Sequence, residues 1–256
     1  MTTGKAALFR ALHTGDPLLL ANSWDVASAR IAEAAGARAI ATTSAGVAWS
    51  LGAPDGDRLD RDSALALIAR IAAAVEVPVT ADLESGYAGT PDGVTETVSR
   101  ALEAGAVGIN LEDGTRPVDD QCARIAAARE AGDEFFLNAR VDTFLTGGDL
   151  ESTLERATAY LAAGADGVFV PGVVAPETVS ALVKGVAAPV NVMVGPGAPS
   201  VAELAALGVA RISLGAAISQ AAYAVVHRST RELLTGGTYT ALAGSFDYGE
   251  LNRLLS

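Results

Sequence analysis

One pattern recurs along the chain: an alanine-rich helical stretch ends in Ala-Gly or a close variant, and a short apolar run follows. The glycine suits the left-handed position just after a helix, and the apolar run is typical of a buried strand. This alternation of helix and strand predicts an α/β protein. Four copies carry the pattern, EAAGARAIATTS at 33–44, EAGAVGINLED at 103–113, AAGADGVFVPG at 162–172 and ALGVARISLG at 206–215.

Four more apolar runs predict strands between these copies, at 18–21, 77–83, 134–140 and 188–193. Periodic apolar positions predict the helices that separate the strands, at about 25–35, 62–75, 91–104, 119–131, 150–163, 176–186, 200–207 and 216–234. We expect the remaining C-terminal stretch to pack outside the main body or against a partner.

Eight strand–helix units in 256 residues predict one α/β domain, a closed (β/α)8 TIM barrel over residues 1–256 with a C-terminal helical extension at about 239–255. The alternative is an open, doubly wound sheet. Polar clusters end at least four of the predicted strands. A barrel brings such ends together at one mouth, whereas an open sheet spreads them along an edge, so the clusters favour the barrel.

The composition and charge of the chain limit its partners and its compartment. Half of the residues are hydrophobic, and the formal net charge is −12. An acidic surface repels phosphate backbones, so we expect no nucleic-acid partner. The one cysteine, Cys122, excludes an intrachain disulfide and is better suited to a buried thiol than to a nucleophile. Without a secretion signal or a long apolar run, the sequence predicts a cytoplasmic protein that does not enter a membrane.

Acidic side chains gather at the ends of three predicted strands. The third strand ends with Asp82 and Glu84, the fourth with Glu112, and the fifth leads to Asp142. Asp82 and Glu84 are two residues apart, so they face the same way for as long as the strand continues. Crowded carboxylates repel each other unless a hard cation neutralises them, and oxygen ligands favour Mg²⁺, with Mn²⁺ as the alternative. Otherwise these acids cap helices or pair with basic residues.

Two further features of the strand ends suit an anionic substrate. Arg140 is the only cation among them, and a guanidinium can clamp a carboxylate or stabilise charge that develops on an oxygen. The alternative role of Arg140 is an ion pair with Glu112 or Asp142. The second strand ends in TTSAG at 42–46, which forms either a carboxylate cradle of open backbone N–H groups or a plain tight turn.

Six segments, taken in order, resemble the isocitrate lyase/phosphoenolpyruvate mutase family. The resemblance covers about residues 18–215 and is specific as a combination, although each piece alone is not. It implies a barrel with Mg²⁺ at its mouth and tetramers that exchange a C-terminal helix between subunits. The segments are ANSWD at 21–25, TSAG at 43–46, LGAPD at 51–55, DLESGY at 82–87, LED at 111–113 and NARVD at 138–142.

The resemblance also implies the residues that hold the metal. Asp82 would bind Mg²⁺ directly, whereas Asp55, Glu84 and Glu112 would hold it through water, and Glu112 would also take part in catalysis. Position 84 is Glu where the family often has Asp, a change that lengthens a water bridge without removing the site.

The substrate contacts follow from the same resemblance. Thr43, Ser44 and Ala45 would bind the substrate carboxylate, and Asn191 at the end of the seventh predicted strand would line the pocket. Arg140 would contact the substrate, and Arg140 and Thr43 are expected to be catalytic.

The chain departs from both named branches of the family just after the Glu-Asp pair. The lyase branch carries a Lys-Cys-Gly-His loop whose Cys is the general acid, but here GTRPV at 114–118 forms a shorter loop and Cys122 does not fit the motif. The mutase branch has Lys directly after Glu-Asp, where this chain has Gly114. Neither named activity transfers as it stands.

What the resemblance implies is chemistry through a metal-stabilised enolate. We expect a Mg-dependent lyase that acts on a small 2-oxo or 2-hydroxy carboxylate by C–C bond cleavage or decarboxylation. One alternative is P–C chemistry of the phosphoenolpyruvate mutase or phosphonopyruvate hydrolase type, and another is a barrel that binds a 2-oxo acid without turnover. The partners expected are the small carboxylate and further copies of the chain, as a homo-oligomer.

Overall fold

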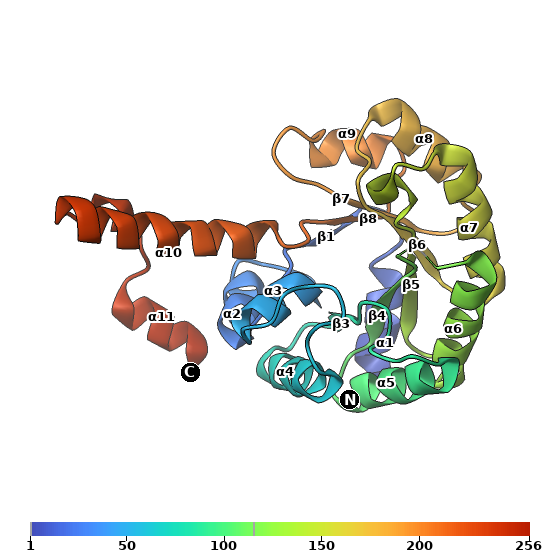
Figure 1. Ribbon diagram of the computed structural model, residues 1–256, viewed down its shortest axis with the longest axis horizontal. Helices are drawn as coiled ribbons and strands as arrows, with labels where there is room; N and C mark the ends of the chain where they lie inside the picture. Colours follow the sequence, from blue (N-terminus) through green and yellow to red (C-terminus); the bar gives the residue numbers. More distant parts are fainter. Residues whose placement is uncertain (1, 115) are drawn as a thin grey trace.

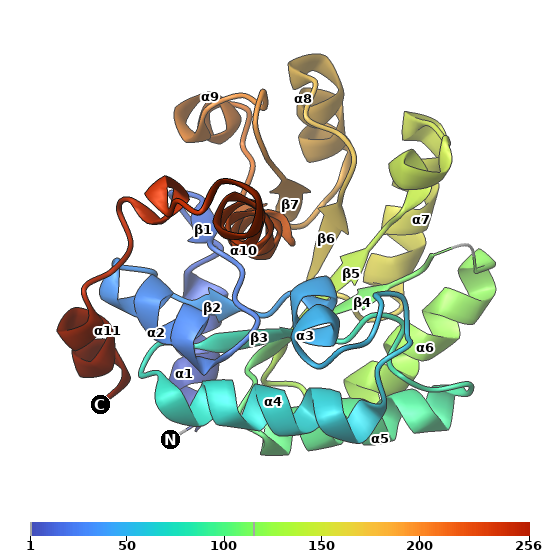
Figure 2. The same cartoon turned by 60° about the vertical axis from the view of Figure 1, so that its left-hand side comes forward.

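Eight parallel strands form the centre of the computed structural model, which describes residues 2–114 and 116–256. Each strand from β2 to β8 lies beside its neighbour in sequence, and β8 pairs with β1. A parallel bridge between Ser23 and Thr42 joins the two remaining edges, so the sheet is a nearly closed barrel (Figure 2). The strands are β1 Leu18–Leu20, β2 Ile40–Ala41, β3 Val79–Asp82, β4 Gly108–Glu112, β5 Phe136–Arg140, β6 Gly167–Val170, β7 Val190–Met193 and β8 Arg211–Ser213.

Helices surround the barrel (Figures 1 and 2). They are α1 Thr2–Ala11, α2 Val26–Ala34, α3 Ser44–Ser50, α4 Arg61–Ala74, α5 Pro91–Glu103, α6 Val118–Glu130, α7 Leu150–Ala162, α8 Pro176–Gly185, α9 Val201–Ala206, α10 Ala217–Gly236 and α11 Tyr248–Leu255, with short 3₁₀ helices η1 Thr143–Thr146 and η2 Thr240–Leu242. The eight predicted strands and eight predicted helices are confirmed, with helix ends shifted by at most two residues. The pairing of β8 with β1 excludes the open, doubly wound sheet.

Local sequence explains where many of the helices begin and end. Asp25, Asp149 and Ser200 each accept a hydrogen bond from the backbone N–H of the third helical residue, which satisfies a donor that the helix leaves free. Gly36 and Gly105 adopt φ of +97° and +102°, a conformation that glycine reaches without strain. The repeated Ala-Gly is therefore the signal that ends a helix and turns the chain into the next strand.

Helix α1, which the sequence patterns did not predict, closes the amino end of the barrel. Phe9 is fully buried in a cluster with Leu18, Val107 and Phe136, which lie at or just before the starts of their strands. Gly108 makes room for this ring, because a Cβ at that position would lie 2.6 Å from Phe9 Cε1. The main apolar core fills the space between strands β3 to β8 and their helices. In the described part of the chain, the open end of the barrel is therefore its carboxyl end.

The C-terminal helices leave the barrel. Helix α10 projects away from it as one long rod, and α11 turns back toward α2 (Figure 1). Large apolar side chains on α10 are exposed, among them Val226, Leu233 and Leu234. Within residues 2–114 and 116–256, no helix combines the length and apolar character needed to cross a membrane.

Candidate active site

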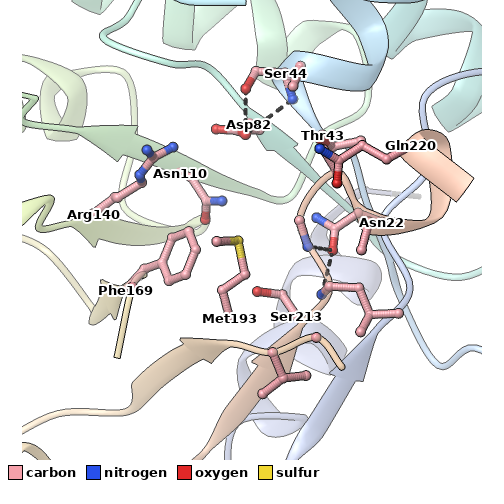
Figure 3. A pocket seen from close by; sticks show the side chains of 18 of the residues that line it. Asn22, Thr43, Ser44, Asp82, Asn110, Arg140, Phe169, Met193, Ser213 and Gln220 are labelled. Atoms are coloured by element: carbon pink, nitrogen blue, oxygen red, sulfur yellow. Dashed lines mark hydrogen bonds between the residues drawn. The ribbon is translucent and has the colours of Figure 1, made fainter. Parts of the chain in front are cut away.

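A cavity of about 560 Å³ opens at the carboxyl end of the barrel, where the polar strand ends meet. Figure 3 shows Asp82, Arg140, Phe169 and Met193 around it, with Arg140 next to the ring of Phe169. The polar residues that line it are Asn22, Thr43, Ser44, Asp55, Asp82, Asn110, Arg140, Ser213 and Gln220, and the apolar ones include Ala45, Phe169, Val174, Met193, Val194 and Pro196. The barrel thus brings together residues from the ends of all eight strands.

Asp82 ends strand β3 and faces the start of helix α3. Its Oδ2 accepts hydrogen bonds from the backbone N–H of Ser44 at 3.2 Å and from Ser44 Oγ at 2.9 Å (Figure 3). Thr42 Oγ1 accepts a hydrogen bond from the Asp82 backbone N–H at 2.8 Å and fixes the end of the strand. Asp82 Oδ1 is buried without a hydrogen-bond partner among the described residues. The segment 42–46, expected as a cradle or a turn, therefore becomes a helix start whose donors already hold an anion.

Glu84 lies behind the cavity wall rather than on it. Strand β3 ends at Asp82, and Glu84 adopts φ of +49°, so the alternation that would keep the two acids on one face stops. Its carboxylate accepts hydrogen bonds from Tyr87 Oη at 3.0 Å and from the Asp57 backbone N–H. Burial raises the pKa of Glu84, and the same cause, followed by repulsion from Asp82, raises the pKa of Asp55.

Strands β4 and β5 place Glu112 beside Arg140, and the side chains form an ion pair with Nη1–Oε2 at 2.5 Å. Arg140 Nε also donates to Asp142 Oδ1 at 2.6 Å. Burial raises the pKa of Glu112 to about 8, although Arg140 opposes this rise, and the charges of Asp82, Asp142 and Glu84 add to it. Arg140 therefore has both of the roles considered for it: it is paired with acids and it lines the cavity.

Asp113, the second residue of the Glu-Asp pair, is buried and anchors the site from behind. Its Oδ2 accepts hydrogen bonds from Tyr160 Oη at 2.7 Å and from Arg156 Nη1 at 3.0 Å. Its Oδ1 accepts the backbone N–H of Asp142 at 2.9 Å. Because Asp142 holds Arg140, this network connects helix α7 to the orientation of the Arg140 guanidinium. Sequence reasoning gave no role to Asp113 or to Arg156.

Asn191 lies inside the barrel below the cavity and does not line it. It is 1% exposed, and its Oδ1 accepts a hydrogen bond from Asn138 Nδ2 at 3.2 Å.

Sequence reasoning missed Asn22, whose Oδ1 accepts the backbone N–H groups of Leu214 and Gly215 at 3.1 and 3.0 Å (Figure 3). The sequence signal that could have identified Asn22 is its position as an isolated polar residue just after an apolar strand.

The donor set suits a hard divalent cation. It consists of carboxylate oxygens, one of which, Asp82 Oδ1, is buried without a partner, and the carboxylates raise one another's pKa. Within the described part of the chain, no three acidic, histidine or cysteine side chains stand close enough together to hold one ion directly.

Comparison with known proteins places this geometry in a family. The phosphoenolpyruvate phosphomutase family model matches residues 9–234. The chain belongs to the phosphoenolpyruvate mutase/isocitrate lyase superfamily. An uncharacterized protein of Mycobacterium tuberculosis is 40% identical over 250 residues, which cover 95% of this chain and 93% of the relative. The 2-methylisocitrate lyase of Escherichia coli K12 is 34% identical over 65% of this chain and 61% of its own length.

Solved structures of the superfamily share the whole fold. A crystal structure from Burkholderia cenocepacia J2315, named only at the level of lyase/mutase, has a TM-score of 0.93 at 41% identity and covers 98% of this chain and 95% of that one. Phosphonopyruvate hydrolase in complex with oxalate and Mg²⁺ has a TM-score of 0.85 at 25% identity, over 98% and 94% of the two chains. Superfamily relatives are thus C–C lyases, mutases and hydrolases of small carboxylates.

Proposed function

We propose that this chain is a Mg²⁺-dependent lyase that acts on a small 2-oxo or 2-hydroxy carboxylate by C–C bond cleavage or decarboxylation. The observation that carries the proposal is that Asp82, Arg140 and the start of α3 converge on the same cavity at the carboxyl end of the barrel. An acid that suits a cation, a guanidinium and open backbone donors together match a ligand that chelates a metal through one oxygen and carries a carboxylate.

In this proposal Asp82 would hold the cation directly, and Asp55, Glu84 and Glu112 would hold it through water. Bound there, Mg²⁺ would supply Lewis-acid stabilisation of the charge that develops on the 2-oxo oxygen. The buried orphan oxygen of Asp82 and the mutual repulsion of the acids support this set. Mn²⁺ has similar ligand preferences and is the natural substitute.

The protein's own groups would bind and orient the substrate. Thr43, Ser44 and Ala45 line the cavity at the start of α3, where backbone N–H groups attract a carboxylate. Arg140 offers its guanidinium, already set by Glu112 and Asp142, to a second oxygen. The apolar wall of the cavity excludes water from the carbanionic side of the reaction.

P–C chemistry is the second candidate, because the family model that matches is that of phosphoenolpyruvate phosphomutase and phosphonopyruvate hydrolase shares the fold. Against it stands Gly114, which replaces the lysine expected after Glu-Asp in the mutase branch. A barrel that binds an oxo acid without turnover is the third candidate, and the short loop after Glu112 favours it, because a lid completes such sites.

We also propose that the chain forms a homo-oligomer through its C-terminal helices. Helix α10 leaves the barrel with Val226, Leu233 and Leu234 exposed, and Tyr239 and Tyr248 beyond it are exposed as well. An unpartnered apolar surface on this scale is typical of an interface. A second copy of the chain would cover these apolar side chains and remove them from water.

The test of the main proposal combines binding and turnover. Calorimetry should detect Mg²⁺ and, in its presence, oxalate, and a panel of 2-oxo and 2-hydroxy dicarboxylates should release a 2-oxo acid. Asp82→Asn should abolish metal binding, whereas Asp16→Asn, at an exposed acid away from the cavity, should not. Phosphonopyruvate turnover seen by phosphorus NMR would favour P–C chemistry, and binding without turnover would favour the third candidate. No metal uptake by the wild type would refute the proposal.

A further inference from the structure

Arg211 is a cation enclosed in the barrel interior without an ion-pair partner among the described residues, and its guanidinium lies over the Phe9 ring, 5.9 Å from the centroid. It lies in strand β8, is 1% exposed, and has no carboxylate within 4 Å of its guanidinium among the described residues. Its Nε and Nη1 have no partner there either. Burial lowers the pKa of Arg211 to about 9, and the charge of Asp82 opposes that fall, so the side chain stays protonated at neutral pH. A buried unpaired charge is costly, so its presence calls for a reason.

Among the described residues, the side chain of Arg211 makes one hydrogen bond, to Asn110 at the base of the cavity. Arg211 Nη2 donates to Asn110 Oδ1 at 3.2 Å, and Asn138 Nδ2 donates to the same oxygen at 3.0 Å. A guanidinium can only donate. The Asn110 amide atom that faces Arg211 must therefore be the oxygen, Oδ1. This fixes the orientation of the amide, with Oδ1 toward the barrel interior.

The other end of the same amide faces the ligand space. Asn110 lines the cavity together with Asp82, Ser44 and Arg140, and its Nδ2 has no acceptor among the described residues (Figure 3). Strand register places Asn110 directly beside Asp82, so this donor lies next to the acid expected to hold the cation. An anionic oxygen bound there would meet an N–H donor polarised from behind by a positive charge.

We propose that Asn110 donates through Nδ2 to an anionic oxygen of the bound carboxylate, and that Arg211 is the positioning residue that holds and polarises this amide. The inference rests on the proposed function, because it needs a carboxylate in the cavity. It differs from the proposed substrate contacts in its source: those lie on α3 and at the end of β5, whereas this donor comes from the interior of the barrel. Arg211 itself does not line the cavity.

The test is a double-mutant cycle read by calorimetry with oxalate in saturating Mg²⁺. Asn110→Ala should weaken oxalate binding about tenfold or more, as loss of a hydrogen bond to a charged group does. Arg211→Met, similar in size but uncharged, should weaken it about three- to tenfold, and Arg211→Lys should restore most of that loss. In the Asn110→Ala background, Arg211→Met should have no further effect, because its action passes through Asn110.

Additive losses would overturn the role of Arg211, and equal oxalate affinities in wild type and Asn110→Ala would overturn the role of Asn110. Should Arg211→Met fail to fold, the side-chain amide resonance of Asn110, assigned by its absence in Asn110→Ala, decides the matter: oxalate should shift it in the wild type, and an unmoved resonance refutes the contact. A wild type that binds Mg²⁺ but not oxalate would refute the proposed function and this inference together. If the wild type binds oxalate but the double-mutant cycle does not give the predicted affinities, this inference is refuted and the proposed function is not.

Discussion

Removal of the Asp113 carboxylate should destabilise the protein strongly and loosen its active site. Asp113 is 1% exposed. Three donors end on it: Tyr160 Oη at 2.7 Å, Asp142 N at 2.9 Å and Arg156 Nη1 at 3.0 Å. In Asp113→Ala the Tyr160 hydroxyl and the Asp142 N–H lose their acceptor, and Arg156 loses its ion pair. Arg156 is partly exposed and keeps Arg116 O and Tyr160 Oη as acceptors, so the main cost comes from the two buried donors left without an acceptor, Tyr160 Oη and the Asp142 N–H, at about 3–5 kcal/mol together.

Asp113→Asn should cost less than Asp113→Ala. The amide oxygen can still accept the backbone N–H of Asp142, and the amide nitrogen can donate to Tyr160 Oη, so the attraction to Arg156 and the acceptor of the Tyr160 hydroxyl are lost while the Asp142 contact remains. We expect about 1.5–3 kcal/mol for this change, the usual worth of a hydrogen bond to a charged group. Comparing the loss of stability in Asp113→Asn with that in Asp113→Ala thus separates the effect of losing the charge from the effect of losing both acceptor oxygens.

Thermal unfolding followed by circular dichroism measures the effect. For a chain of this size each kcal/mol shifts Tm by about 2–4 °C, so Asp113→Ala should lower Tm by about 6–20 °C. Glu155→Ala is the matched control, because Glu155 is exposed on the same helix as Arg156, and it should change stability by less than about 0.5 kcal/mol. The reasoning fails if Asp113→Ala unfolds within 2 °C of the wild type, or if Asp113→Asn proves the more damaging change.

Three further predictions concern pH, the metal and assembly. Burial lowers the pKa of His13 from 6.5 to about 4, so as pH drops below 6.5 the unfolded chain binds a proton that the folded chain does not, and the free energy of unfolding falls. At pH 5 the free energy of unfolding from urea titrations should be lower by about 2 kcal/mol. This loss should vanish in His13→Phe. Since burial raises the pKa of Glu112 to about 8, Mg²⁺ should bind more tightly as pH rises from 6 to 8, and calorimetry on Glu112→Gln should show a flat profile. Val226→Glu and Leu234→Glu should each reduce the oligomer mass seen by sedimentation, and an unchanged mass would contradict the proposed interface.

Much of the barrel could be predicted because its signals are local. The Ala-Gly stops depend on backbone conformations that glycine favours, as at Gly36 and Gly105, and the apolar runs depend on burial of both faces of a parallel strand. Helix α1 escaped prediction because its role is tertiary: Phe9 fills a space beside Gly108 that exists only once the strands have assembled. Helix α3 escaped for a similar reason, since Thr43 makes no side-chain cap hydrogen bond and a distant acid, Asp82, accepts from the first residue of the helix.

The candidate site was predictable where chemistry sits at a strand end and unpredictable where it depends on register. Asp82, Glu112 and Arg140 stand out as charges that end apolar runs, and the structure places them around one mouth. Glu84 did not follow its two-residue spacing, because a left-handed backbone at +49° turns its side chain behind the cavity wall. Spacing predicts direction only while the strand continues, and nothing in DLES marks Asp82 as its last residue.

Polar residues inside the apolar strands indicate buried hydrogen bonds, but their partners are known only once the strand register is known. Asn110, Asn138, Asn191 and Arg211 each interrupt a buried run, and a buried polar group needs a partner. The sheet pairs Asn110 with Asn138 and Asn191 with Arg211, and hydrogen bonds join all four into one polar layer of the barrel. Barrel interiors are usually filled with branched apolar side chains. A layer of amides closed by a guanidinium gives up that packing, and it gains a fixed donor, Asn110 Nδ2, directed at the cavity above.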